Sequence, residues 1–160
     1  TDGEEDGLYG AKYFVENPPV SLSEISLNVN MDMLGHGARK KRLYIAGTRH
    51  HKHLKSSVEP LLDGLSSPLI RLKLGHDGIH HSRVGSNSRV NWKRASDHAA
   101  FIKKGIAYLY FGVDTNATYH TDKDTYERLD IEFYVEAVNA IKVIVNEIQM
   151  LSPEQLNYKS

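Results

Sequence analysis

Residues 25–33 read Ile-Ser-Leu-Asn-Val-Asn-Met-Asp-Met, and apolar and polar side chains alternate along the whole stretch. Successive side chains of a β-strand point to opposite faces of a sheet, so this period of two predicts a strand with one apolar face. Asp32 lies near the carboxyl end of this strand and is soon followed by Gly35. Open α/β sheets bind ligands outside the carboxyl ends of their strands, which places Asp32 where a functional site is expected.

Helix-like and strand-like segments alternate along the rest of the chain, without an internal repeat. Apolar residues at spacings of three and four predict helices, and an uninterrupted apolar run is typical of a buried parallel strand. We therefore expect one domain over residues 1–160 with an α/β fold, in which a mixed, mostly parallel sheet is flanked by helices on both faces. The expected helices are 8–16, 54–65, 97–104 (with Asp97 as its cap) and 131–151, and the expected strands are 25–33, 42–47, 68–74 and 106–111.

Composition excludes several classes of protein. The 160 residues include 20 basic and 20 acidic side chains and no cysteine. Balanced charge argues against a nucleic-acid partner, and the absence of an apolar run of about 18 residues argues against a membrane span. Without cysteine there are no disulfides, and histidine and carboxylate are the strong metal ligands that remain.

The long segment Gly75–Ser96 is polar, dotted with glycine and free of periodicity. Loops of this length inside a compact domain are often functional, so we expect it to form a wall of a cleft. It carries a small basic and aromatic patch, which at zero net charge we interpret as a solvated loop and not as a nucleic-acid surface. The patch consists of Arg83, Arg89, Trp92, Lys93 and Arg94.

Glu4-Glu5, Asp32 and His120 stand out because each lies at the end of an expected strand or in a loop. Taken singly, each has an ordinary interpretation: a solvated surface pair, a turn residue and a surface or core histidine. Their convergence at one edge of the sheet is the hypothesis that would give them a shared function.

Four short motifs strengthen that hypothesis, because together they resemble the ordered signatures of peptidase family twenty-eight. This family comprises zinc exopeptidases and includes bacterial leucyl aminopeptidases. The resemblance extends over almost the whole chain. The motifs are Gly3-Glu4-Glu5-Asp6-Gly7-Leu8, Asn30-Met31-Asp32-Met33-Leu34-Gly35, Ser96-Asp97-His98 and Tyr119-His120-Thr121-Asp122-Lys123-Asp124-Thr125.

The resemblance implies hydrolysis of N-terminal peptide bonds, with a peptide as substrate and two zinc ions in the complete enzyme. Glu4 matches the general base, and Tyr119 matches a residue that steadies the transition-state oxygen in some members. Asp97 and His98 match a motif that lines the site or lies just behind it. The residues that match metal ligands, divided between the two ions, are Glu5, Asp32 and His120. The resemblance also favours a secreted or periplasmic location.

The chain departs from the family at its start, because two further ligands, a histidine and a metal-bridging aspartate, lie upstream of the Gly-Glu-Glu motif in the family. Here Thr1 is followed at once by that motif, with no methionine or leader. We therefore expect the C-terminal portion of a peptidase domain, whose partner is the missing N-terminal segment. Alone it should be inactive, bind at most one zinc weakly, and self-associate through an exposed sheet edge.

Two other functions remain open. A glutaminyl-peptide cyclotransferase shares the architecture but uses one zinc to cyclise N-terminal glutamine. A non-catalytic, peptidase-like binding domain would keep the fold without the reaction.

Overall fold

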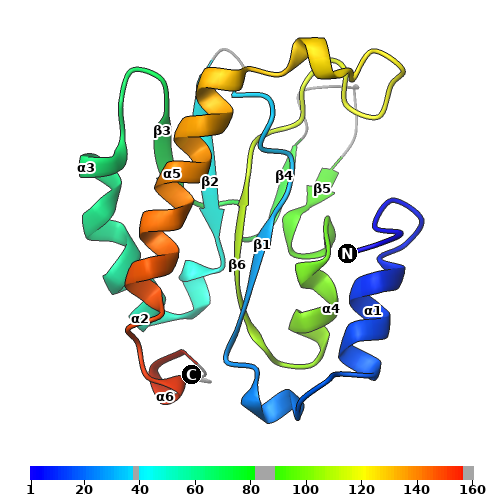
Figure 1. Ribbon diagram of the computed structural model, residues 1–160, viewed down its shortest axis with the longest axis vertical. Coiled ribbons are helices and arrows are strands. Elements are labelled where there is room, and N and C mark those ends of the chain that lie inside the picture. Colours follow the sequence, from blue (N-terminus) through cyan, green and yellow to red (C-terminus); the bar gives the residue numbers. More distant parts are fainter. Residues whose placement is uncertain (38–39, 82–88, 157–160) are drawn as a thin grey trace.

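The computed structural model describes residues 1–37, 40–81 and 89–156. Its centre is a four-stranded sheet in the order β1-β6-β2-β3 (Figure 1). The strands are β1 (Leu27–Met31), β2 (Arg42–Ala46), β3 (Arg71–Leu74) and β6 (Ala107–Gly112). β1 pairs with β6 and β2 pairs with β3 in parallel, whereas β2 and β6 are antiparallel. This confirms the mixed, mostly parallel sheet.

Helices cover both faces of this sheet, as expected (Figure 1). On one side lie α2 (Lys52–Val58), α3 (Leu62–Leu65), α5 (Ile131–Ile148) and α6 (Pro153–Leu156). On the other side lie α1 (Tyr9–Glu16) and α4 (His98–Lys103). The 3-10 turns are η1 (Leu22–Glu24), η2 (Thr48–His50), η3 (Glu59–Leu61), η4 (Trp92–Arg94) and η5 (Tyr126–Arg128).

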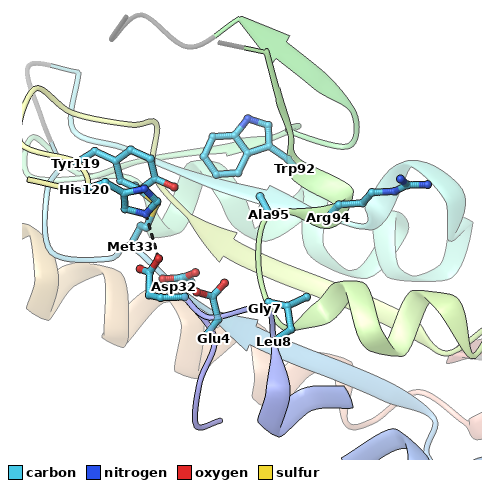
Figure 2. Close-up of a pocket in the computed structure, with 11 residues that line it drawn as sticks. Glu4, Gly7, Leu8, Asp32, Met33, Trp92, Arg94, Ala95, Tyr119 and His120 are labelled. Carbon is cyan, nitrogen blue, oxygen red and sulfur yellow. Dashed lines mark ion pairs between the residues drawn. The ribbon is translucent and has the colours of Figure 1, made fainter. Parts of the chain in front are cut away.

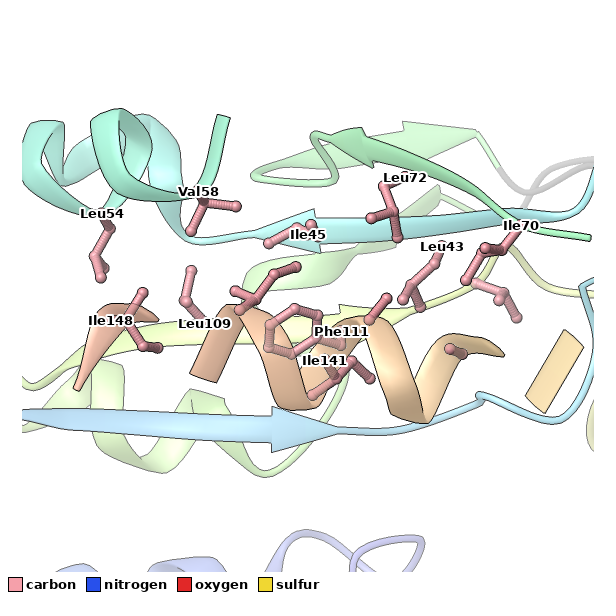
Figure 3. Packing of buried hydrophobic residues seen from close by; sticks show 14 of the residues in the cluster. Leu43, Ile45, Leu54, Val58, Ile70, Leu72, Leu109, Phe111, Ile141 and Ile148 are labelled. Atoms are coloured by element: carbon pink, nitrogen blue, oxygen red, sulfur yellow. The ribbon is translucent and has the colours of Figure 1, made fainter. Parts of the chain in front are cut away.

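The main core lies between the sheet and α5 (Figure 3). Alternate residues of β2 and β6, such as Ile45 and Phe111, point to this side and are fully buried. They meet Phe133, Ile141 and other α5 residues that repeat at spacings of three and four. Full burial of each large apolar side chain contributes about 1.5–3 kcal/mol, so this face supplies most of the hydrophobic stabilisation.

The opposite face of the sheet is aromatic and partly polar. Tyr108 and Tyr110 of β6 are buried there under α4, which explains why this strand is an uninterrupted apolar run. The alternation in β1 has the same cause: Leu27 and Val29 pack toward the main core, while Asn30 points to the α4 side. The polar face of the predicted strand is therefore covered as well.

Two expectations about local structure are wrong, and a third is confirmed in position only. The helix at 54–65 is interrupted by η3, where Pro60 lacks an amide hydrogen to donate. The segment Gly75–Ser96 is not wholly irregular, because β4 (Ile79–His81) and β5 (Arg89–Asn91) pair as an antiparallel hairpin. Asp97 is the N-cap residue of α4, as predicted, but its side chain makes no cap hydrogen bond.

No helix in residues 1–37, 40–81 and 89–156 is both long enough and apolar enough to cross a membrane.

Candidate active site

A tight turn before α1 holds the adjacent glutamates. The backbone amides of Gly7 and Leu8 both donate to the carbonyl of Glu4, at 3.0 and 2.9 Å. Gly3 and Gly7 flank the pair with φ angles of 64° and 118°, a left-handed region that glycine adopts without steric cost. The glycines of the motif therefore serve to fold the chain back and present Glu4 and Glu5.

Asp32 follows the last residue of β1, as the sequence predicted. Its backbone amide donates to the carbonyl of Phe111 at 3.1 Å, which extends the ladder to β6 by one bond. Met33 then takes a φ of 57° and turns the chain away from the sheet. The carboxylate of Asp32 is thus anchored at the carboxyl edge of two parallel strands.

Tyr119 and His120 lie in the loop that follows β6. Their rings stack at a centroid distance of 3.8 Å. Asn116 folds the start of this loop, because its side-chain oxygen accepts from the amide and the hydroxyl of Thr118, both at 2.7 Å. Further on, His36 Nε2 lies 3.0 Å from an Asp124 oxygen and ties the loop to the segment after β1.

These segments meet around one pocket of about 260 Å³ (Figure 2). His120 Nε2 faces Glu5 Oε2 at 3.2 Å. The structure therefore brings together five residues selected from the sequence, Glu4, Glu5, Asp32, Tyr119 and His120. The remaining lining residues are Gly7, Leu8, Met33, Trp92, Arg94 and Ala95.

Backbone strain is concentrated at this pocket. Leu8, Met33 and His120 all line it, and all three have positive φ angles, of 63°, 57° and 56°. A non-glycine residue held in this region costs on the order of 1–3 kcal/mol and persists only where the surroundings enforce it. Such strain clusters at functional sites, which is independent support for a function of this pocket.

The electrostatics of the pocket are dominated by carboxylates. Burial raises the pKa of Glu4, and the negative charges of Asp32, Glu5 and Asp97 raise it further, against a hydrogen bond from Ser96. Burial and the charges of Glu5, Asp32 and Glu4 also raise the pKa of Tyr119, so its phenol stays protonated. Gathered negative charge favours a cation.

The donor atoms suit zinc, which binds imidazole nitrogen and carboxylate oxygen. Glu5 and His120 face each other as two ligands of one ion would, and Asp32 lines the same pocket. Among the residues that the structure describes, however, no three His, Cys, Asp or Glu side chains are close enough to hold one ion. The ligand chemistry fits zinc, and the ligand set in these residues is partial.

Asp97 and His98 lie behind the pocket and do not line it. His98 is fully buried, with its ring 5.1 Å from Tyr108 and 4.8 Å from Tyr110. Asp97 accepts a hydrogen bond from the hydroxyl of Thr1. Its second carboxylate oxygen, Oδ1, is buried without a partner in the described part of the chain, so it can accept from a further donor.

The prediction that Trp92 belongs to a solvated loop is wrong. Trp92 is only 4% exposed, packs near Tyr110 and forms one wall of the pocket. Arg94 also lines the pocket, although Figure 2 shows its guanidinium pointing away from the carboxylates. The expectation that the long segment forms a wall is confirmed by these two residues, while Arg83 lies outside the described residues. The signal in the sequence was the tryptophan itself, because this residue type is highly buried on average.

Comparison with solved structures agrees with this fold. The chain is similar in structure to BSAP, a zinc aminopeptidase from Bacillus subtilis, with a TM-score of 0.64 and 21% identity over 93% of this chain and 35% of that one. It is also similar to the LapA aminopeptidase of Legionella pneumophila, with a TM-score of 0.54 and 18% identity over 89% of this chain and 37% of that one.

The chain thus spans little more than a third of the length of these solved structures. No curated protein matches the sequence significantly. The sequence profile of peptidase family M28, in contrast, matches residues 1–145. The chain belongs to peptidase family M28.

Proposed function

We propose that this chain supplies the base and three metal ligands of a zinc aminopeptidase. The observation that carries the proposal is the approach of Glu5 and His120 to 3.2 Å in a pocket that Glu4 and Asp32 also line. Glu5 and His120 would hold one ion, and Asp32 would hold a second. When bound, zinc lowers the pKa of a coordinated water and polarises a peptide carbonyl.

Glu4 acts as the general base. Its neighbour Glu5 is committed to the metal, so Glu4 is the carboxylate left to take a proton from the attacking water and pass it to the leaving amine. The raised pKa of Glu4 moves it toward the operating pH, where a base can both accept and release a proton efficiently. Two adjacent carboxylates thus have two roles.

Tyr119 contributes a hydrogen-bond donor. Because its pKa is raised, the phenol keeps its proton at neutral pH and can donate to an oxygen that becomes negative in the transition state. The zinc aminopeptidases that resemble this chain in structure support aminopeptidase activity as part of the proposal.

The remaining ligands would come from another part of the full-length protein. β1 has β6 as its one strand partner in the described sheet, and its other edge is open to pairing. Leu27 and Val29 on this strand are only half-buried, although their side chains pack toward the main core. We propose that a further strand of the full-length protein pairs with β1; without it, this edge would promote self-association.

The test compares Glu4→Gln with Glu5→Gln in the full-length protein. Both should lower hydrolysis of aminoacyl anilides, and for Glu4→Gln the loss in kcat should be about 100-fold to 10,000-fold. Elemental analysis should find zinc retained in Glu4→Gln and reduced in Glu5→Gln. Loss of zinc from Glu4→Gln would show that Glu4 is a ligand and contradict its role as base.

The same preparation separates the alternatives. One zinc per molecule together with cyclisation of N-terminal glutamine would indicate a glutaminyl-peptide cyclotransferase. Peptide binding without turnover of either substrate would indicate a non-catalytic domain.

A further inference from the structure

A line of hydrogen bonds runs behind the pocket from its wall toward Glu4. It starts at the backbone carbonyl of Trp92, passes through His98 and Asn30, and ends at Ser96. Hydrogen bonding from the Ser96 side chain in turn lowers the pKa of the Glu4 carboxylate, against the effect of burial. His98 is fully buried and Ser96 is 2% exposed, so solvent cannot replace these partners freely. The line therefore links three separate segments of the chain.

Elementary donor and acceptor rules fix the direction of each bond. His98 Nε2 lies 2.6 Å from the carbonyl of Trp92, which can only accept, so Nε2 carries the hydrogen. Burial lowers the pKa of His98 and keeps the imidazole neutral, which leaves Nδ1 with a lone pair. Nδ1 therefore accepts from the Asn30 amide nitrogen at 3.1 Å.

The Asn30 amide has two hydrogens, and both are used. One is donated to His98, and the other is donated to the Ser96 hydroxyl oxygen at 2.9 Å. Because Ser96 accepts from Asn30, its own hydroxyl hydrogen is left for the carboxylate of Glu4. Asparagine fits this position because it can donate twice from one nitrogen.

We infer that Asn30 is a positioning residue for Glu4: its amide sets the orientation of the Ser96 hydroxyl, which donates to the carboxylate. This role rests on the proposed function, because it matters for catalysis only if Glu4 is the base. Asn30 touches neither the pocket nor the reacting atoms and acts through Ser96.

The substitution Asn30→Asp tests the direction of the bonds with almost no change in size. A carboxylate can only accept, so the Ser96 hydroxyl would turn from Glu4 to residue 30. Nδ1 of His98 would then face an acceptor and would need a hydrogen of its own. Positions behind a catalytic site typically affect activity or metal affinity by about 10-fold to 100-fold.

The experiment uses the full-length, zinc-loaded protein and three readouts. Asn30→Asp should lower kcat by about 10-fold to 100-fold, with KM and zinc content little changed. Long-range ¹H–¹⁵N correlation spectra should show His98 with hydrogen on Nε2 alone in the wild type and with hydrogen on Nδ1 in Asn30→Asp. Asn28→Asp places the same charge on the same face of β1 and reports the general cost of that charge.

A double variant separates positioning from a structural effect. If Asn30 acts through Ser96, Asn30→Asp combined with Ser96→Ala should be no slower than Ser96→Ala alone. Additive losses, an unchanged kcat in Asn30→Asp, or a wild-type His98 with hydrogen on Nδ1 would each overturn the inference. The wild-type spectrum shows which ring nitrogen of His98 carries the hydrogen even if the variants fold poorly. A wild type that does not hydrolyse aminoacyl anilides would instead overturn the proposed function, and the catalytic role of Asn30 with it.

Discussion

The two faces of the sheet differ in chemistry, although helices cover both. The face under α5 is packed with aliphatic side chains and Phe111 (Figure 3), together with Phe133. The face under α4 carries Tyr108, Tyr110, Trp92 and the buried His98 with its hydrogen bonds. The α5 face supplies most of the hydrophobic stabilisation, and the α4 face lies behind the pocket.

This division teaches that a strand with a period of two need not leave its polar face in water. In β1 the apolar residues Leu27 and Val29 pack toward the main core, whereas we propose that Asn30, and Asp32 just after the strand, act at the site. Substitutions on the two faces should therefore have separable effects, on unfolding free energy for the α5 face and on turnover for the α4 face.

The largest effect is expected from Phe133→Ala. Phe133 is fully buried at the start of α5, and its ring packs closely against Gly37. Truncation of a buried phenylalanine typically lowers the free energy of unfolding by about 3–5 kcal/mol. Chemical denaturation measures this loss, while zinc content per folded molecule should not change.

Val135→Ala is the matched control, since Val135 lies on the same helix but is 48% exposed. It should change stability by less than about 0.5 kcal/mol. An equal loss in both variants would mean that α5 does not pack as the structure has it.

Tyr119→Phe should have the next largest effect, and it should appear in turnover. Removal of one donor to a transition-state oxygen typically lowers kcat by about 100-fold to 1,000-fold. Steady-state kinetics of the full-length protein should show this with little change in KM or unfolding free energy. Tyr126→Phe is the control, because Tyr126 is 74% exposed and lies outside the pocket. A similar loss of kcat in Tyr126→Phe would show that Tyr119 has no special role.

The α5 face was largely predictable, because burial leaves a periodic pattern in the sequence. The spacing of Tyr134, Val138, Ile141, Val145 and Ile148 predicts a helix where α5 lies, but Tyr134 and Val138 are exposed, and the fully buried Phe133 and Ile144 are not among these five. The pocket residues were found by motif, and the structure brings five of them together.

The support behind the pocket was not predictable from the sequence. Asn30 is 66 residues from Ser96 and 68 from His98 in the chain, and it meets them only when β1 and α4 pack together. Trp92 was misassigned because a basic stretch masked a buried side chain. Such contacts depend on tertiary distances, which periodicity does not encode.

A change in pH should also distinguish the two faces. Burial lowers the pKa of His98. Below about pH 6.5, His98 is therefore protonated in the unfolded state while it stays neutral in the folded state. The unfolded state then binds more protons, and stability falls as pH drops through this range until His98 protonates in the folded state. The slope is at most about 1.4 kcal/mol per pH unit from this group.

Denaturation midpoints at several pH values for wild type and His98→Gln measure this contribution. The variant should lose part of the slope between neutral and mildly acidic pH, because the other histidines are the same in both proteins. Identical slopes would mean that His98 is not held neutral in the folded state.

The smallest expected effect is at the start of α5, where the two faces are joined by the loop that carries His120. Asp130 is the N-cap of this helix, and its carboxylate accepts from the amide of Phe133 at 3.1 Å. Asp130→Ala leaves that amide without its partner, which typically lowers the free energy of unfolding by about 1 kcal/mol. Asp130→Asn keeps an oxygen acceptor at the same place and should leave the free energy of unfolding nearly unchanged.

Because the backbone amide of residue 130 can still donate to the carbonyl of Gly35, at 2.9 Å in the wild type, the end of the loop should stay attached to the segment after Asp32 in both variants. Urea denaturation with parallel zinc analysis should therefore find stability reduced in Asp130→Ala alone and zinc content equal in both. If zinc content fell with stability, the helix start would also position His120, and the separation between a stabilising face and a functional face would not hold at this end of the sheet.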